Sequence, residues 1–235
     1  LDATIMEQTK KGERIAKVIA ASGACSRRDA EKIIAEGRVK VNGKIINSPA
    51  INITNEKITI DDILITRADK ARLFKYYKPV GLVTSHKDEK GRQTVFDSLP
   101  KNLPRVISVG RLDLNSEGLL LLTTSGELAR KFELPSSNYE RVYRVRVYGD
   151  VNMHALQKLQ NGIEIDGVHY GAIKVEQEKS GKNSWLRITL HEGKNREIRR
   201  VLKHFGLEVS RLIRTSYGDY ELGNMQAGDV VEVGL

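Results

Sequence analysis

The chain has 235 residues, which is enough for one large domain or two smaller ones. Hydrophobic residues make up 40% of it, so it can bury a real core and is not a disordered chain. Its 39 Lys and Arg residues exceed its 30 Asp and Glu residues, and the net charge of +9 favours a polyanionic partner such as nucleic acid or an anionic membrane.

Several other classes of protein are disfavoured by what the sequence lacks. No apolar run approaches the roughly 20 residues of a membrane span, and no secretory signal is visible at the start. The single cysteine, Cys25, excludes an intrachain disulfide and fits a reducing compartment, so we expect a cytoplasmic protein. Met6 offers an alternative start, which would make residues 1–5 upstream sequence.

Residues 12–62 predict a compact N-terminal unit. Its expected elements are helices over residues 14–22 and 27–36, a hairpin over 39–46 and a strand over 58–60. Ser26 is placed to cap the second helix, with Asp29 in the capping-box position. Asn42-Gly43 between alternating apolar residues is the strongest short hairpin signal in the chain.

The rest of the chain predicts a mixture of strands and helices. Residues 63–72 have the composition of a linker, with Thr66, Arg67, Asp69 and Lys70 clustered there. The expected strands cover residues 73–77, 82–84, 106–109, 119–123, 142–148, 172–177, 185–190 and 230–233, and the expected helices 126–133, 153–160 and 196–205. Since strands and helices do not alternate regularly, we expect an α+β fold with a mainly antiparallel, mixed sheet and flanking helices.

Basic residues gather on the second helix and the hairpin of the N-terminal unit. They are Arg27, Arg28, Lys32, Arg38, Lys40 and Lys44. Ser26 and the helix start also direct backbone N–H groups outward, where a phosphate can dock. An ordinary solvated surface carries similar runs, so charge alone leaves RNA binding open.

The order of the residues favours RNA binding. Residues 14–34 (RIAKVIAASGACSRRDAEKII) and 37–44 (GRVKVNGK) closely resemble the S4 domain, a small α/β module that binds structured RNA. The resemblance implies recognition by shape and phosphate contacts. The residues expected to contact RNA in this unit are Arg14, Ser26, Arg27, Arg28, Lys32, Lys40, Asn42 and Lys44.

The segment GRLDLNSEGLLLL, residues 110–122, places the carboxylate of Asp113 beside Arg111 and between two apolar runs. A calcium loop is excluded because its twelfth position would be Thr124 and its second half would be leucines. Two interpretations remain open from the residues alone: a structural corner in which Asp113 pairs with Arg111, or a nucleophile sheltered from water.

Residues 110–129 (GRLDLNSEGLLLLTTSGELA) resemble the signature of the pseudouridine synthases, in their RsuA/RluB branch. Further matching segments are YKPVGLVTS (77–85), RVYRV (141–145), EGKNREIRR (192–200) and SRLIR (210–214). Ser116 stands where Thr is common. The resemblance implies a catalytic domain over residues 73–235, after the S4-like domain at 12–62 and the linker at 63–72.

The resemblance implies that the enzyme isomerises uridine within RNA, by breaking the N-glycosidic bond, turning the uracil and forming a C–C bond. The target base must leave its stack. By resemblance Asp113 is the catalytic carboxylate, Arg111 holds the displaced nucleotide, Tyr143 packs against the base and Leu212 lines the pocket. Arg199 would pair with the carboxylate and keep it ionised. Whether Asp113 attacks the base or the ribose stays open.

Partners and cofactors follow from the same resemblance. The residues expected to contact RNA near the pocket are Lys194, Asn195, Arg196, Arg200, Arg211 and Arg214. The reaction implies no cofactor, and the five histidines show no metal-binding spacing. We expect a monomer that acts on ribosomal RNA or a ribosome-assembly intermediate, without a membrane.

Within the branch, the residues most resemble the RluB-type enzymes, which implies a target in the large-subunit (23S) rRNA. The segments that carry this resemblance are residues 77–84 (YKPVGLVT), the S4-like domain and residues 211–218 (RLIRTSYG). Two alternatives are a small-subunit (16S) enzyme of the RsuA type and a non-catalytic RNA-binding assembly factor.

Overall fold

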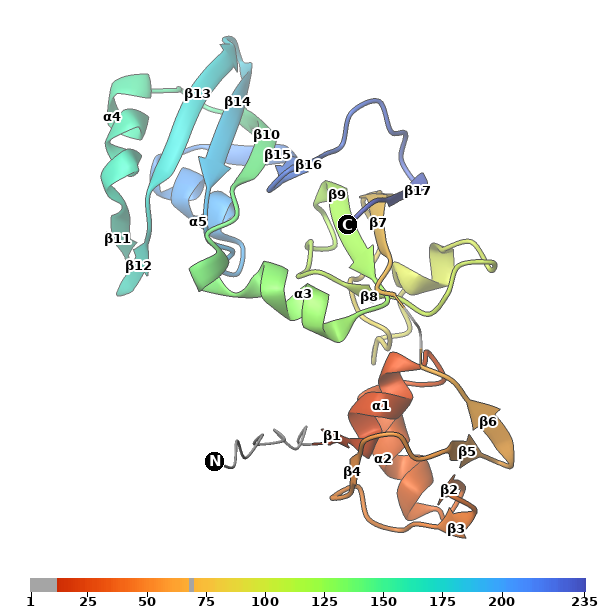
Figure 1. The fold of residues 1–235 in the computed structure, drawn as a ribbon. Helices are drawn as coiled ribbons and strands as arrows, with labels where there is room; N and C mark the ends of the chain where they lie inside the picture. Colours follow the sequence, from red (N-terminus) through yellow and green to blue (C-terminus); the bar gives the residue numbers. More distant parts are fainter. Residues whose placement is uncertain (1–11, 68–69) are drawn as a thin grey trace, which may run out of the picture. The chain divides into compact units, whose positions relative to one another are not determined.

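The computed structural model describes residues 12–67 and 70–235 (Figure 1). The candidate upstream residues 1–5 and Asp69 of the expected linker lie outside these ranges. By internal contacts the chain divides into two units. The first consists of the residues up to Ala71 together with Pro104–Val106, and the second consists of Arg72–Leu103 and Ile107–Leu235. In the described ranges, no helix has both the length and the apolar character to cross a membrane.

The first unit packs two helices against a small sheet. Its elements are β1 (Glu13–Arg14), α1 (Ile15–Ala21), α2 (Arg27–Ala35), β2 (Val39–Val41), β3 (Lys44–Ile45), β4 (Asn52–Ile53), β5 (Ile58–Ile60) and β6 (Ile63–Ile65). Both predicted helices, the hairpin and the strand at 58–60 are confirmed. The Ser26 side chain accepts the N–H of Asp29 at 3.1 Å, and Asn42 and Gly43 both have positive φ, as a type I′ turn requires.

Strand β6 corrects one prediction, because Ile63–Ile65 were expected to belong to the linker. The strand pairs antiparallel with β5 at the edge of the sheet β3-β2-β5-β6. It is joined to β5 by Asp61 and Asp62, which both have positive φ. The turn has no glycine and Ile63 is 71% exposed. The sequence therefore shows neither a typical hairpin turn nor an alternation of buried and exposed residues that would predict the strand.

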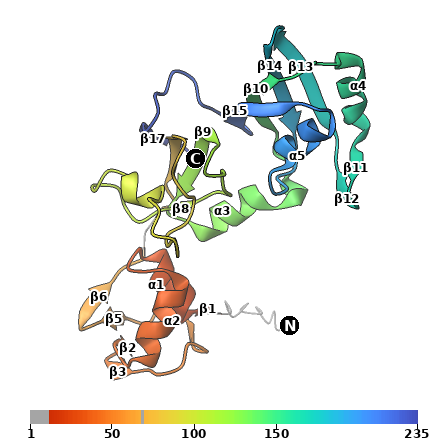
Figure 2. The same cartoon turned by 180° about the vertical axis from the view of Figure 1, so that it is seen from behind.

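The second unit is built on one large sheet (Figures 1 and 2). Its strands are β7 (Leu73–Lys78), β8 (Ile107–Ser108), β9 (Glu117–Thr123), β10 (Arg141–Tyr148), β11 (Ile163–Ile165), β12 (Val168–Tyr170), β13 (Ile173–Lys179), β14 (Asn183–Leu190), β15 (Glu208–Tyr217), β16 (Tyr220–Glu221) and β17 (Val230–Val233). The described part of the sheet runs β13-β14-β10-β15-β9-β7-β17, with β8 beside β9 and β16 beside β15. Only the β9–β15 pair is parallel, so the predicted mainly antiparallel, mixed sheet is confirmed.

The helices of the second unit bury two cores against this sheet. They are α3 (Gly126–Glu133), α4 (Met153–Gln157) and α5 (Glu197–His204), with 3-10 turns at Phe96–Ser98, Pro135–Ser137 and Lys158–Asn161. Helices α4 and α5 pack on β10, β13, β14 and β15, whereas α3 packs on β9 and β7. Both cores meet at β15, so the strand order brings the two halves of the unit together there.

Several element predictions in this unit need correction. Strands β11, β12, β15 and β16 were not predicted; in β15, Ser210, Arg211 and Arg214 interrupt the apolar alternation. Residues 82–84 form no strand but a single bridge between Val83 and Thr94. The helix expected over 153–160 is α-helical only as far as Gln157 and continues as a 3-10 turn.

Candidate active site

A glycine makes the junction of β9 and β15 possible. Gly118 faces Arg214 in the parallel register and has φ +105. A Cβ at this position would lie 2.3 Å from the carbonyl oxygen of Arg214, so only glycine fits. The loop that enters β9 carries Asp113 and is thereby held against β15.

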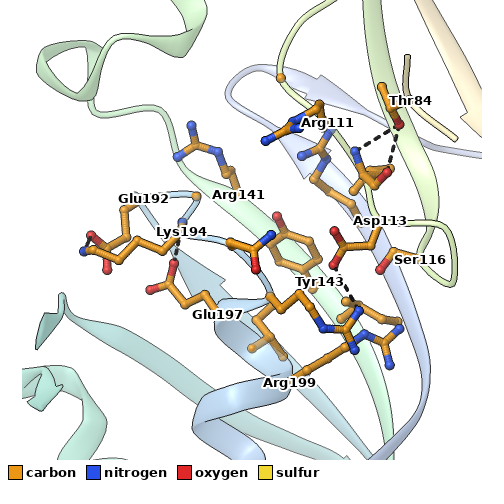
Figure 3. A pocket seen from close by; sticks show the side chains of 18 of the residues that line it. Thr84, Arg111, Asp113, Ser116, Arg141, Tyr143, Glu192, Lys194, Glu197 and Arg199 are labelled. Atoms are coloured by element: carbon orange, nitrogen blue, oxygen red, sulfur yellow. Dashed lines mark hydrogen bonds and ion pairs between the residues drawn. The ribbon is translucent and has the colours of Figure 1, made fainter. Parts of the chain in front are cut away.

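A pocket of about 790 Å³ opens where this loop meets β10, β15 and the start of α5 (Figure 3). All five side chains expected to take part in catalysis line it, namely Arg111, Asp113, Tyr143, Arg199 and Leu212. Four of the residues expected to contact RNA also line it: Lys194, Asn195, Arg196 and Arg214. Arg200 and Arg211 lie outside it. Residues that are more than 100 positions apart in the sequence, such as Arg111 and Arg214, thus lie around one carboxylate.

The buried Lys78 anchors the turn that presents Asp113. Its ammonium is inaccessible to solvent and donates to the carbonyl oxygens of Pro79 (3.0 Å), Asp113 (3.1 Å) and Ser116 (2.8 Å). Burial lowers the pKa of Lys78 to about 8, although the nearby carboxylates of Asp113 and Glu117 act in the other direction. One ammonium therefore binds both ends of the Asp113–Ser116 turn.

Thr84 holds the same loop from the other side. Its hydroxyl donates to the carbonyl oxygen of Leu112 at 2.8 Å and accepts the N–H of Leu112 at 3.3 Å (Figure 3). The N–H of Gly110 donates to Glu133 at 2.8 Å. With the backbone fixed at Gly110, Leu112 and Asp113, the carboxylate has few positions to occupy.

Two arginines of the α5 region reach this loop. Arg196 lies 3.7 Å from the Asp113 carboxylate, whereas Arg199 donates to the carbonyl oxygens of Asn115 (2.8 Å) and Val209 (3.4 Å). The resemblance implied a pair between Arg199 and Asp113; the ion pair recorded for this carboxylate is with Arg196, and Arg199 acts on it through its charge. Arg196 precedes the helix with φ 51 and turns toward the carboxylate, while Arg199 lies one turn further along. Burial and the charge of Arg196 lower the pKa of Arg199.

The floor of the pocket is apolar and comes from two neighbouring strands. Tyr143 on β10 is 8% exposed and Leu212 on β15 is 7% exposed. In Figure 3 the ring of Tyr143 lies next to the Asp113 carboxylate. An aromatic ring beside a fixed carboxylate is a surface on which a planar base can stack within reach of that carboxylate.

Buried polar atoms without hydrogen-bond partners concentrate at this pocket. In the described part of the chain five such side-chain atoms occur, and one of them, on Thr59, lies in the first unit. The other four belong to lining residues: Ser116 Oγ, Glu197 Oε1, Arg199 Nε and Arg214 Nη2. Because buried polar groups are normally paired, the three atoms on Ser116, Arg199 and Arg214 indicate a site for a polar ligand.

The charge of the pocket lining is positive on balance. Its cations are Arg92, Arg111, Arg141, Lys194, Arg196, Arg199 and Arg214, and its acids are Asp113, Glu133, Glu192 and Glu197. Such a balance suits a ligand that carries phosphates. Across residues 12–67 and 70–235, no group of His, Cys, Asp and Glu side chains is arranged to hold a metal ion.

The remaining residues expected to contact RNA divide into exposed and engaged side chains. Those exposed to solvent on the first unit are Arg27, Arg28, Lys32 and Lys44, and Ser26 is the cap of α2. Engaged side chains on that unit are Arg14, which donates to the Ala50 carbonyl, Lys40, which pairs with Asp62, and Asn42, which accepts the Lys57 N–H. On the second unit, Arg200 contacts Asn195 and Arg211 pairs with Glu117.

Sequence reasoning missed three residues that shape the site: Lys78, Thr84 and Glu197. The first two lie in the quoted segment 77–85 and the third in 192–200, so each stood in a matching motif without an assigned role. Nothing in their spacing shows that Lys78 is buried or that Thr84 faces Leu112. These contacts depend on strands far apart in the chain.

Comparison with known proteins agrees with this geometry. The RNA pseudouridylate synthase family profile matches residues 72–204, and the S4 domain profile matches residues 13–56. A protein of Rickettsia bellii (strain RML369-C) named an uncharacterized RNA pseudouridine synthase is 55% identical over 223 residues, 94% of this chain and 96% of its own length. The ribosomal large subunit pseudouridine synthase B of Salmonella typhi is 46% identical over 89% of this chain and 75% of its own. A crystal structure of a pseudouridylate synthase superposes with a TM-score of 0.67 at 27% identity, covering 94% of this chain and 96% of that one.

Proposed function

This chain belongs to the RNA pseudouridylate synthase family, and on that premise we propose that it converts a specific uridine of 23S ribosomal RNA to pseudouridine with Asp113 as the nucleophile. The observation that carries the assignment of Asp113 is its position: the turn is bound by Lys78, and the carboxylate lies beside Tyr143 in a positively charged pocket. The choice of 23S rRNA is supported by the relatives named ribosomal large subunit pseudouridine synthase B.

In the proposed mechanism the target uridine leaves its stack and its base packs against the ring of Tyr143. The carboxylate of Asp113 attacks an electrophilic carbon of the nucleotide and forms a covalent intermediate. The glycosidic bond between N1 and the ribose breaks and the uracil turns; C5 then bonds to the same ribose carbon, and the bond to Asp113 breaks so that the carboxylate is restored. C5 loses its proton to water and N1 takes one up, so the product is an isomer of the substrate and no external donor is needed.

In this proposal the other polar residues of the pocket position the nucleophile and bind the RNA. Arg196 lies 3.7 Å from the carboxylate and so helps to hold the nucleophile in place. Arg111 is exposed at the mouth of the pocket, where it can hold the displaced nucleotide. Lys194 and Asn195 are exposed on the same rim and are proposed to bind phosphates.

We assign the two units to separate tasks. The S4 domain is proposed to bind the RNA substrate, and the second unit to carry out the chemistry, in a protein that acts as a monomer in the cytoplasm. Ribosomal RNA, free or in an assembly intermediate, is the proposed partner.

The target is tested by mapping pseudouridine in 23S and 16S rRNA from cells that lack the gene and from cells in which it is restored. We expect one pseudouridine to disappear from 23S rRNA and to return on restoration. Loss of a 16S pseudouridine instead would overturn the assignment to 23S rRNA, and an unchanged pattern in both rRNAs would overturn the rRNA assignment altogether.

The S4 domain leads to a prediction about salt. Reversing the charges of the exposed Arg27 and Arg28 (Arg27→Glu, Arg28→Glu) should weaken RNA binding and reduce the slope of log K against log salt by about 1.5, since each lost phosphate contact removes about 0.7–0.9. The measurement is a filter-binding titration at several salt concentrations.

The matched control reverses two exposed lysines of the second unit, Lys179→Glu and Lys182→Glu, which changes the net charge equally. We expect this variant to keep most of the salt slope. Equal losses in both variants would show that only net charge matters, and would contradict the assigned role of the S4 domain.

A further inference from the structure

Two carboxyl groups meet beneath the loop that carries Arg196. Glu197, at the start of α5, is 4% exposed, and its Oε2 accepts the N–H of Lys194 at 3.0 Å. The carboxylate of Glu192 accepts the N–H of Gly171 at 2.7 Å and is paired with the Lys194 ammonium. Figure 3 shows both carboxyl groups bound to Lys194, Glu197 to its backbone N–H and Glu192 to its ammonium.

The backbone of this loop is closed on itself by the same residues. The N–H of Glu197 donates to the Lys194 carbonyl at 3.2 Å, so its main chain and side chain both bind Lys194. Arg196, which ends the loop, has φ 51 and no side-chain cap precedes the helix. The position of Arg196 near Asp113 therefore depends on the closure of residues 192–197.

We propose that Glu197 and Glu192 share one proton, and that this carboxyl pair clamps the loop so that Arg196 stays at Asp113. Glu197 Oε1 is buried and has no other partner in the described part of the chain, which makes it the atom that would carry the proton. Two ionised carboxylates in contact would repel each other and open the loop. Glu197 is thus a positioning residue, and the inference about activity rests on the proposed function.

The electrostatics support the clamp. Burial, together with hydrogen bonding to and repulsion by Glu192, raises the pKa of Glu197 from 4.5 to about 8. The pKa of Glu192 is lowered to about 2, because hydrogen bonds from Glu197, Lys194 and the Gly171 N–H outweigh its own burial. Other charged or titratable groups near the pair include Arg141 of β10, beside Gly193, and Tyr170 of β12, whose ring centroid is 6.0 Å from the Lys194 ammonium. His191 and Arg196 line the same pocket as the pair.

Thermal stability tests the shared proton without any RNA. Between pH 4.5 and about 8 the folded protein keeps a proton on Glu197 that the unfolded chain has lost, so the stabilising contribution of Glu197 decreases as the pH rises. Glu197→Gln keeps a donor and an acceptor but does not titrate. We expect the Tm of Glu197→Gln minus that of the wild type to increase by about 3 °C or more from pH 5 to pH 7.5, followed by the fluorescence of the single Trp185. A constant difference would overturn the proposal.

Activity tests the connection to Asp113. We expect Glu197→Ala to lower kcat at pH 7 about tenfold or more with KM within about twofold, because a displaced Arg196 affects the chemistry more than RNA binding. Glu197→Gln should restore most of kcat, and its ratio to the wild-type kcat should rise about tenfold from pH 7 to pH 9 as Glu197 ionises in the wild type. A ratio that does not change with pH, or a Gln variant as slow as the Ala variant, would overturn the clamp.

The two measurements separate this inference from the proposed function. If the wild type makes no pseudouridine but the Tm difference changes with pH as expected, the proposed function is wrong and the shared proton is supported. If the wild type is active and the Tm difference does not change with pH, only the shared proton is wrong.

Discussion

The Asp113→Asn variant is expected to form pseudouridine at least about 10⁴-fold more slowly than the wild type while it still folds and binds RNA. An amide is nearly the same size as the carboxylate but is not a nucleophile. The backbone contacts of the turn, from Lys78 to the carbonyl of residue 113 and from the N–H of Ser116, do not involve the changed atoms. The measurement is tritium release from RNA labelled at C5 of uridine, with binding titrated in parallel.

The expected cost in stability is small. The Asp113 side chain is 34% exposed and its ion pair with Arg196 is 3.7 Å long, so its loss costs about 0.5 kcal/mol or less. Asp150→Asn, which removes an exposed carboxylate away from the pocket, serves as the control with unchanged activity. An Asp113→Asn variant that still releases tritium at a wild-type rate would remove Asp113 from the mechanism.

Gly118→Ala is expected to destabilise the second unit by about 4 kcal/mol and to lower its Tm by about 10 °C. The added Cβ would meet the backbone oxygen and nitrogen of Arg214 at 2.3 and 2.8 Å, and backbone atoms of a paired strand have little freedom to move. Urea unfolding followed by Trp185 fluorescence gives the free energy of unfolding of this unit.

Gly81→Ala is the matched control, because Gly81 has a similar φ of +96 but no atom within 4 Å of the added Cβ. It should show only the strain of the left-handed backbone, about 1–3 kcal/mol. If both variants lose the same stability, the close approach of β9 and β15 at Gly118 contributes nothing beyond that strain.

Local signals predicted the fold well wherever one element carries its own signature. The cap at Ser26, the Asn42-Gly43 turn and the leucines after Gly118 each specify an element within a few residues, and the structure has those elements. Strand β15 was not predicted because it is stabilised by pairing with β10 on one side and β9 on the other, and not by an alternation of apolar and polar residues in its own sequence.

The candidate site was predictable as a set of residues but not as a set of contacts. The resemblance implied Asp113, Tyr143 and Arg199 together, and the pocket contains all three. It did not show which arginine meets the carboxylate, because that depends on the φ of 51 at Arg196 and on loop closure by Glu197. A buried lysine such as Lys78 is likewise invisible in sequence, since only the folded chain places three carbonyl oxygens around its ammonium.

The parallel pairing of β9 with β15 also has a consequence for the order of events during synthesis. Gly118 and Arg214 are in register although 96 positions separate them (214 − 118), so this contact closes late compared with the local hairpins. The four-stranded sheet of the N-terminal unit is complete once Ile65 has emerged, because it needs no later strand. A growing chain therefore presents a folded S4 domain well before β15, which carries Leu212 and Arg214 of the candidate site, has been synthesised.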